Sequence, residues 1–381
     1  MTINEFIIKE ASEKDREGLT WFDIAYKANS EFGTNLTAEA CRKRAMRASS
    51  FEEEDTEEGI DSKILELKKE RMKLSDERTQ TNAIIRRIAR EETIKEIAEK
   101  YCATLDKIYK LPTFNDKVFR ENLYKEGILL LSDWHYGIDV DNIFNKYSPE
   151  ICKKRVNYLE RKVSQILHDE EISTLNIINL GDMIAGRIHL TIRLNSRIDV
   201  ITQTMEVAEL LAQFITHITA QGVNINYYST SDNHSRLEPN LKDSLELESL
   251  SRIIDWFLRA RLRDNEHVIF YENQFGDDIV AFKLLQYKVA GVHGNKDKLD
   301  KIIDRLNTFT HEHFDLICSA HYHHFSCDES NETVLISNAS LMGTDDFAFN
   351  LRLNSKPSQV LIVSTQDNIC DHLYKINLDK E

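Results

Sequence analysis

Aspartate, asparagine and histidine residues stand directly after five apolar runs of this 381-residue sequence. The five segments read SDWHYG, NLGDMI, STSDNHS, VAGVHGN and CSAHYHH. Their candidate metal ligands are Asp133, His135, Asp182, Asn233, His293, His321 and His323, and His234 directly follows Asn233. A single histidine after a strand is more often a hydrogen-bonded surface residue, but five such ends in order are hard to assemble by accident. Because ligands bind outside the carboxyl ends of strands in open α/β sheets, we expect these side chains to meet.

The residue types indicate the chemistry. Carboxylate and amide oxygens with imidazole nitrogens suit borderline divalent ions such as manganese, iron, zinc or nickel. A carboxylate such as that of Asp182 can bridge two ions, and two ions about 3.5–4 Å apart can clamp a phosphoryl group and lower the pKa of a bound water. No cysteine belongs to the set, which disfavours a closed structural zinc site. Patterns of P-loop, zincin and serine-hydrolase sites are absent from the sequence.

Strands and helices must position these residues, and the hydrophobic pattern predicts both. Short apolar runs predict strands at 127–132, 175–180, 223–228, 268–271, 279–284, 287–292, 316–319, 334–336 and 360–363. Helices are expected at about 149–168, 199–220 and 241–263. Strands alternate with helices in the first part of this region and follow one another in its last part. This order predicts an α/β domain with layered, mixed sheets.

The ordered motifs Asp-x-His, Gly-Asp, Asn-His, His and His-x-His resemble the calcineurin-like metallophosphoesterases, and the match covers about two-thirds of the chain. This superfamily includes protein phosphatases, cyclic-nucleotide phosphodiesterases and DNA-repair nucleases. The segments SDWHYG, VHGNKD and GTDDFAFN are most similar to phosphoesterases encoded by bacteriophages. The resemblance implies a layered β-sandwich flanked by helices.

The resemblance also implies a role for each matched residue. One ion would be held by Asp133, His135 and His323, the second by Asn233, His293 and His321, and Asp182 would bridge them. A hydroxide held between the ions would attack phosphorus in line. His234 would donate a proton to the leaving oxygen or stabilise the charge of the transition state. Manganese is the first choice for the two divalent ions, with iron, zinc, nickel or magnesium as alternatives.

The sequence departs from the family pattern at several positions. Asp232 and Ala320 replace the glycines usual before Asn-His and before His-x-His, and a glycine at such a turn permits positive φ. The Asp-Arg continuation of the protein-phosphatase branch is missing from residues 183–186, which disfavours Ser/Thr phosphatase activity. Residues without a counterpart in the motif are His311, His313 and His324, expected to be structural or solvated, and Asn295, Lys296 and Asp297, which are weak candidates for substrate contact.

Residues 1–50 are predicted to form a small helical domain. Two short helices are expected within 20–48, broken at Gly33, with Thr37 as the N-cap of the second. The second helix would end in Arg42, Lys43, Arg44 and Arg47, like the recognition helix of a helix-turn-helix. These residues either contact DNA or form a solvated basic face.

Residues 51–125 are predicted to connect this domain to a catalytic domain at 126–381. The acidic run at 52–58 is expected to be a solvated linker, and a helix is expected over 60–100. That helix could pair with a second copy as an irregular coiled coil and so make a homo-oligomer, or it could pack on the catalytic domain.

Bulk charge and cysteine usage limit the classes of function. A formal net charge of −15 argues against a protein that coats nucleic acid by charge alone, although a local patch could still bind it. Six scattered cysteines without a CxxC pair, no signal-peptide pattern and no run of 18 apolar residues predict a cytoplasmic protein without a membrane partner, in the host cytoplasm if the chain is phage-encoded.

Three functions remain open at this point. The first is a metal-dependent nuclease acting on DNA, motivated by the basic helix at 37–48 and by the resemblance. The second is a phosphodiesterase acting on small molecules such as cyclic nucleotides, which the negative charge favours. The third is a DNA-binding or scaffold protein whose metal site is degenerate.

Overall fold

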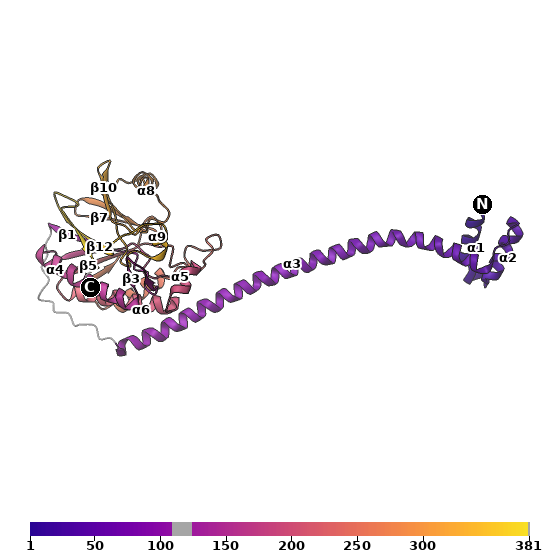
Figure 1. Ribbon diagram of the computed structural model, residues 1–381, viewed down its shortest axis with the longest axis horizontal. Coiled ribbons are helices and arrows are strands. Elements are labelled where there is room, and N and C mark those ends of the chain that lie inside the picture. Colours follow the sequence, from indigo (N-terminus) through magenta and orange to yellow (C-terminus); the bar gives the residue numbers. More distant parts are fainter. Residues whose placement is uncertain (109–123, 380–381) are drawn as a thin grey trace. The chain divides into compact units, whose positions relative to one another are not determined.

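The computed structural model describes residues 1–108 and 124–379, and the chain divides into two compact units, Met1–Lys95 and Glu96–Glu381 (Figure 1). The first unit contains α1 (Ile3–Glu17), α2 (Trp21–Phe32) and most of α3 (Ala38–Ile108). Capping boxes begin α1 at Thr2 and α2 at Thr20, and both helices end at a glycine in the left-handed conformation. The three helices enclose a small core of Phe6, Ile7, Ile24, Ala25, Ala28 and Cys41.

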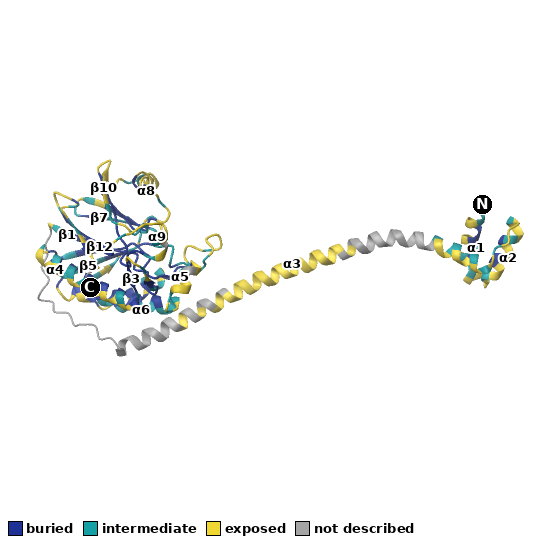
Figure 2. Ribbon diagram, in the orientation of Figure 1, coloured by how far each residue is buried: buried dark blue, intermediate teal, exposed yellow. Residues whose placement is uncertain are grey.

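Both helices predicted within 20–48 are present, but the second is much longer than predicted. Thr37 caps the second helix, since its Oγ1 accepts the amide of Ala40 at 3.2 Å. That helix does not end in the basic residues, because α3 continues to Ile108. The acidic run at 52–58, expected as a linker, lies inside α3, as glutamate is a good helix former. Cys41 at the start of α3 is buried, but apolar side chains further along this helix, among them Leu67, Leu74 and Ile88, are exposed (Figure 2).

The second unit contains two large sheets. The six-stranded sheet has the order β13-β12-β1-β4-β5-β6 and is formed by β1 (Lys125–Leu131), β4 (Thr174–Asn179), β5 (Asn224–Ser229), β6 (Val268–Phe270), β12 (Ser358–Thr365) and β13 (His372–Asn377). The five-stranded sheet has the order β10-β11-β9-β8-β7 and is formed by β7 (Ile279–Leu284), β8 (Tyr287–Val292), β9 (Leu316–Ser319), β10 (Ser326–Ser330) and β11 (Thr333–Ser337). A hairpin joins β2 (Val140–Asp141) to β3 (Lys146–Tyr147).

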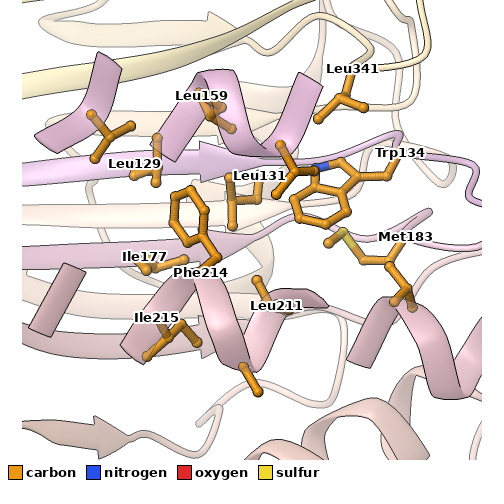
Figure 3. Close-up of a cluster of buried hydrophobic side chains, with 14 of the residues drawn as sticks. Leu129, Leu131, Trp134, Leu159, Ile177, Met183, Leu211, Phe214, Ile215 and Leu341 are labelled. Atoms are coloured by element: carbon orange, nitrogen blue, oxygen red, sulfur yellow. The ribbon is translucent and has the colours of Figure 1, made fainter. Parts of the chain in front are cut away.

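Within the described residues 124–379, the helices that accompany these sheets are α4 (Pro149–Asp169), α5 (Leu190–Asn195), α6 (Val200–Thr219), α7 (Ser251–Arg261), α8 (Ile302–Thr310) and α9 (Asp346–Asn350). Successive strand residues face opposite sides, so β1 serves two cores. Leu129 and Leu131 pack among side chains of α4 and α6 (Figure 3), and Ile128 and Leu130 pack against the five-stranded sheet. A further core lies between α8 and the five-stranded sheet.

The predicted layered α/β fold is confirmed, and each predicted strand corresponds to a strand of the two sheets. One predicted helix is too long: α7 begins at Ser251, because residues 241–250 form turns. Strand β10 was not predicted, since its sequence SCDES has exposed polar residues without apolar alternation. Across residues 1–108 and 124–379, no helix is both long and apolar enough to span a membrane.

Candidate metal centre

The sheets bring the five strand ends together. Strands β1, β4 and β5 run parallel in one sheet, and β8 and β9 run parallel in the other, so their carboxyl ends lie at one edge of each sheet. Within the described residues, side-chain donors form three close groups: Asp133 with His135 and His323, Asp182 with His135 and His234, and Asp182 with His293 and His321. The structure therefore assembles all the histidines and carboxylates expected from the sequence.

The first group surrounds Asp133. Its Oδ1 lies 3.4 Å from Nε2 of His323 and 3.8 Å from Nε2 of His135. The two imidazole Nε2 atoms are only 3.1 Å apart. Oδ2 of Asp182 lies 3.9 Å from Nε2 of His135, so it adjoins this group.

The second group surrounds His293. Its Nε2 lies 3.1 Å from Oδ2 of Asp182, 2.9 Å from Oδ1 of Asn233 and 3.2 Å from Nδ1 of His321. Asp182 thus stands between the two groups, where a bridging carboxylate is expected.

Two buried oxygen atoms test whether metal ions fit here. Oδ1 of Asp133 and Oδ2 of Asp182 are buried and have no hydrogen-bond partner among the described residues. A buried carboxylate oxygen without a partner is costly, and each of these points into a group of imidazole nitrogens. A divalent cation at each group would satisfy both oxygens, so the residues present fit two ions.

Backbone conformation singles out the same residues. Asp133, His135, Asp182, His321 and His323 all have positive φ, between 44° and 70°. Non-glycine residues adopt this conformation rarely, and such residues cluster at functional sites. The loops after β1, β4 and β9 therefore hold their side chains in an unusual geometry that the surrounding fold must stabilise.

The carboxylates of the site are ionised at neutral pH. Burial alone would raise the pKa of Asp133, but the neighbouring His323 outweighs it and lowers the pKa to about 2. His234 and His293 likewise overcome burial and lower the pKa of Asp182 well below its ordinary value. Burial lowers the pKa of His135. The site thus combines buried anions with a neutral imidazole, which suits a cation.

Backbone carbonyls fix two of the imidazole rings. Nδ1 of His293 lies 2.7 Å from the carbonyl oxygen of Leu180, and Nδ1 of His234 lies 2.7 Å from that of Ala185. Because a carbonyl oxygen only accepts hydrogen bonds, each Nδ1 carries the proton and each Nε2 faces the site.

The two departures from glycine cause no strain. Neither Asp232 nor Ala320 has positive φ. Oδ1 and Oδ2 of Asp232 accept the amide and hydroxyl of Ser235 at 2.7 and 2.9 Å, which stabilises the turn that carries Asn233. Ala320 is buried, with its amide bonded to the carbonyl oxygen of His293 at 2.9 Å. These replacements therefore lend no support to a degenerate site.

A buried arginine that the sequence analysis missed supports the Asp133 loop. Nη1 of Arg155 donates to the carbonyl oxygens of Leu341 and Met342 at 3.0 and 2.6 Å. Ser340, which precedes Leu341, holds Asp133, because its hydroxyl donates to the carbonyl oxygen of Asp133 at 2.9 Å. Only the three-dimensional structure reveals this role, because an arginine within an amphipathic helix normally indicates a solvated face.

His189 is a second residue that the sequence analysis missed. Its ring meets that of His234 edge to face, with centroids 6.0 Å apart, and His234 in turn meets His135 at 4.6 Å. Burial, with His234 and Arg236, lowers the pKa of His189. The sequence could have pointed to His189 because it lies in a segment after Asp182 that contains no aspartate or glutamate.

The weaker candidates have defined positions. Asn295, Lys296 and Asp297 line a cavity of about 820 Å³ that His293 also lines, and Lys296 is tied to Glu246 and Asp278 at 2.8 and 2.9 Å. His311 ends α8, and Nδ1 of His324 lies 3.1 Å from the carbonyl oxygen of Tyr322.

The basic residues proposed to bind DNA all lie near the start of α3. Lys43 pairs with Glu39 at 3.4 Å, and Arg44 donates to Asn4 at 3.3 Å. Arg42 is exposed. The contact of Arg42, Lys43, Arg44 and Arg47 with DNA stays a prediction.

Comparison with known proteins gives one relative in sequence. No family model matches the chain. It is 25% identical over 399 aligned positions to the SPbeta prophage-derived uncharacterized protein YonJ of Bacillus subtilis (strain 168), covering 98% of this chain and 96% of that protein.

Solved structures with similar arrangements include an archaeal phosphodiesterase, with 14% identity, a TM-score of 0.35 and coverage of 66% of this chain and 99% of that one. Another is Vps29 complexed with zinc from Entamoeba histolytica, with 10% identity, a TM-score of 0.32 and coverage of 66% and 99%. At such scores the superpositions carry no argument. Residues 125–378 form a layered α/β domain with two facing sheets, in which five strand ends bring the candidate metal ligands together.

Proposed function

We propose that this chain is a two-metal phosphodiesterase that hydrolyses nucleic acid, with DNA as its first expected substrate. The observation that carries the reaction class is the pair of buried, unpartnered oxygens of Asp133 and Asp182, each within a group of histidine nitrogens. Such an arrangement stabilises cations, and cations at adjacent sites stabilise phosphoryl transfer.

The division of the seven candidate ligands that we propose is the one that the resemblance implies. Asp133, His135 and His323 would hold one ion, while Asn233, His293 and His321 would hold the other, and Asp182 would serve both. When bound, the ions supply Lewis acidity to the phosphoryl oxygens and lower the pKa of a water molecule. Manganese suits this donor set and is the ion to test first.

His234 is the proposed proton donor. Its Nδ1 is fixed on the carbonyl oxygen of Ala185, which leaves Nε2 facing the site at 3.9 Å from Oδ2 of Asp182. As an imidazolium, it can donate the Nε2 proton to the leaving oxygen of the substrate. In the same position, the positive charge of the imidazolium would stabilise the negative charge that develops on the oxygen atoms bound to phosphorus.

The helical first unit supports DNA as the substrate. The turn between α2 and α3 precedes a helix whose first turns carry Arg42, Lys43, Arg44 and Arg47. In helix-turn-helix proteins the beginning of the second helix contacts base edges in the major groove. The prophage origin of the relative described above is consistent with an enzyme of phage type.

A cleavage assay tests the proposal. Single- and double-stranded DNA is incubated with the full chain and manganese, and His234→Ala is compared with the wild type. We expect metal-dependent cleavage that falls strongly in the variant. Absence of metal-dependent cleavage of either form of DNA would exclude DNA as the substrate.

A small nucleotide is the second candidate substrate, because the cavity of about 820 Å³ beside His293 falls within the size range of small-molecule pockets. The net charge of −15 also repels long polyanions. Profiling hydrolysis of cyclic mono- and dinucleotides beside DNA separates the two. Turnover of a cyclic nucleotide with inert DNA would favour this second function.

A further inference from the structure

The segment between β4 and α6 has a charge opposite to that of the chain. Residues 183–198 contain Arg187, His189, Arg193 and Arg197 and no aspartate or glutamate, whereas the whole chain has 64 acidic residues against 49 lysines and arginines. The segment begins directly after Asp182. A local positive charge therefore adjoins the candidate metal centre.

Two residues of this segment, His189 and Arg193, are joined by a backbone hydrogen bond, and His189 contacts His234. The ring of His189 stands edge to face on that of His234, with centroids 6.0 Å apart and an interplanar angle of 69°. His189 is the N-cap of α5, and its carbonyl oxygen accepts the amide of Arg193 at 3.0 Å. Since residues four apart lie on the same face of a helix, Arg193 stands one turn beyond His189.

Arg193 is available to bind a ligand. It is exposed, and within the described parts of the chain its guanidinium has no hydrogen bond or ion pair. The neighbouring Arg197 differs, because it pairs with Asp139. Leu190 and Leu194 on the same short helix are also exposed, at 70% and 73%.

Backbone hydrogen bonds hold the segment against the loop that carries two of the candidate ligands. The amide of Asp139 donates to the carbonyl oxygen of Asn195 at 2.9 Å, and the amide of Arg197 donates to that of Gly137 at 3.2 Å. Ile138 and Ser196 form an isolated bridge. The backbone that follows Arg193 is therefore held against the loop that carries Asp133 and His135.

We propose that His189 and Arg193 bind the backbone phosphates that neighbour the phosphodiester cleaved at the metal centre, and that the substrate is accordingly a polynucleotide strand. The inference rests on the proposed function and narrows it. Arginine recognises phosphate through a planar fork of donors, and phosphate contacts position a strand without reading its sequence. On this proposal, a short diester would occupy the metal centre without contacting Arg193.

Steady-state kinetics on two substrates test the inference. The full chain with manganese is assayed on bis(p-nitrophenyl) phosphate and on single-stranded DNA and RNA of about 20 nucleotides, longer than one strand-binding site. Variants are His189→Ala, Arg193→Ala and Arg193→Lys. The matched control is Arg263→Ala, at an arginine whose side chain is 77% exposed.

We expect Arg193→Ala to raise KM for the oligonucleotide about tenfold, as a charge-assisted contact would, and to leave hydrolysis of the small diester unchanged. The slope of log KM against log salt should change by about 0.7, the value for one phosphate contact on a single strand. Arg193→Lys should keep that slope, and Arg263→Ala should match the wild type. Effects shared by DNA and RNA show that the backbone phosphate is recognised, and the lower wild-type KM identifies the preferred strand.

Two results would overturn the inference. One is an unchanged KM and salt slope for the oligonucleotide in both alanine variants. The other is an equal loss on both substrates, which would place these residues in support of the fold or of the reaction itself. Failure of the proposed function gives a different result, since the wild type would then hydrolyse no oligonucleotide, whether or not it hydrolyses the small diester.

Discussion

His234 donates its Nδ1 proton to the carbonyl oxygen of Ala185 across 2.7 Å, and this contact aims Nε2 at Asp182. The donor therefore has one fixed tautomer in its neutral form. Replacement of His234 by asparagine or alanine should lower kcat by about 10²- to 10⁴-fold, the usual contribution of a general acid. Metal content, measured by elemental analysis, should stay at that of the wild type. Loss of metal in these variants would instead make His234 a ligand.

Asp182 adjoins both donor groups, whereas Asp133 belongs to one. Asp182→Asn should therefore weaken binding at both metal positions, and Asp133→Asn chiefly at one. Titration of the chelated protein with manganese by calorimetry gives the stoichiometry of each variant. The wild type should take up two ions per chain, and chelation should lower its Tm because both ions bind only the folded state. Identical stoichiometry in the two variants would contradict a bridging role for Asp182.

Arg155 stabilises the domain from beneath the Asp133 loop. Arg155→Met keeps most of the buried volume but removes the donors to Leu341 and to Asn145, which lie 3.0 and 3.2 Å from the guanidinium. We expect the free energy of unfolding to fall by about 2–4 kcal/mol, because buried acceptors lose a charged donor. Urea denaturation measures the change, and Arg155→Lys should recover part of it. A change below about 0.5 kcal/mol, the size typical of surface substitutions, would show that the loop does not depend on this contact.

Asp255 gives the stability of the domain a pH dependence. Burial raises the pKa of this carboxyl from 3.8 to about 6, although the hydroxyl of Ser229 donates to it at 2.5 Å. The folded state therefore binds this proton more tightly than the unfolded state, so ionisation of Asp255 lowers the unfolding free energy as pH rises from about 4 to about 6. Asp255→Asn removes this loss.

The stability of Asp255→Asn relative to the wild type should accordingly rise across that window, by on the order of 2 kcal/mol. Urea denaturation at pH 4.5, 5.5 and 6.5 measures the difference, with Asp264→Asn at an exposed carboxylate as the control. A pH-independent difference between variant and wild type would contradict the assignment.

The candidate metal ligands were predictable because the ends of the strands can be recognised in the sequence. Apolar runs marked β1, β4, β5, β8 and β9, and polar metal-binding side chains follow each of them. Parallel pairing then places these ends together. That inference needed no knowledge of contacts between residues far apart in the sequence. The types of these residues and their places directly after the strands were enough.

Other features depend on packing that no local pattern encodes. Arg155 lies 186 residues from the carbonyl of Leu341 that it contacts. His189 became a candidate only when its ring was found beside that of His234. The continuity of α3 through the acidic run was missed because charge density was taken as a break, although glutamate does not interrupt a helix.

The left-handed conformation of five candidate ligands, from Asp133 to His323, has a consequence for how the centre fills. Backbone hydrogen bonds support these dihedral angles, since the amides of Asp133 and His135 donate to the carbonyl oxygens of Gly181 and Asp182 at 3.0 Å. We therefore expect the chelating atoms to be aimed before any metal arrives. Loading should then be a simple bimolecular encounter. In a stopped-flow experiment its observed rate would grow in proportion to metal concentration, without the plateau that marks a slow rearrangement of the chain.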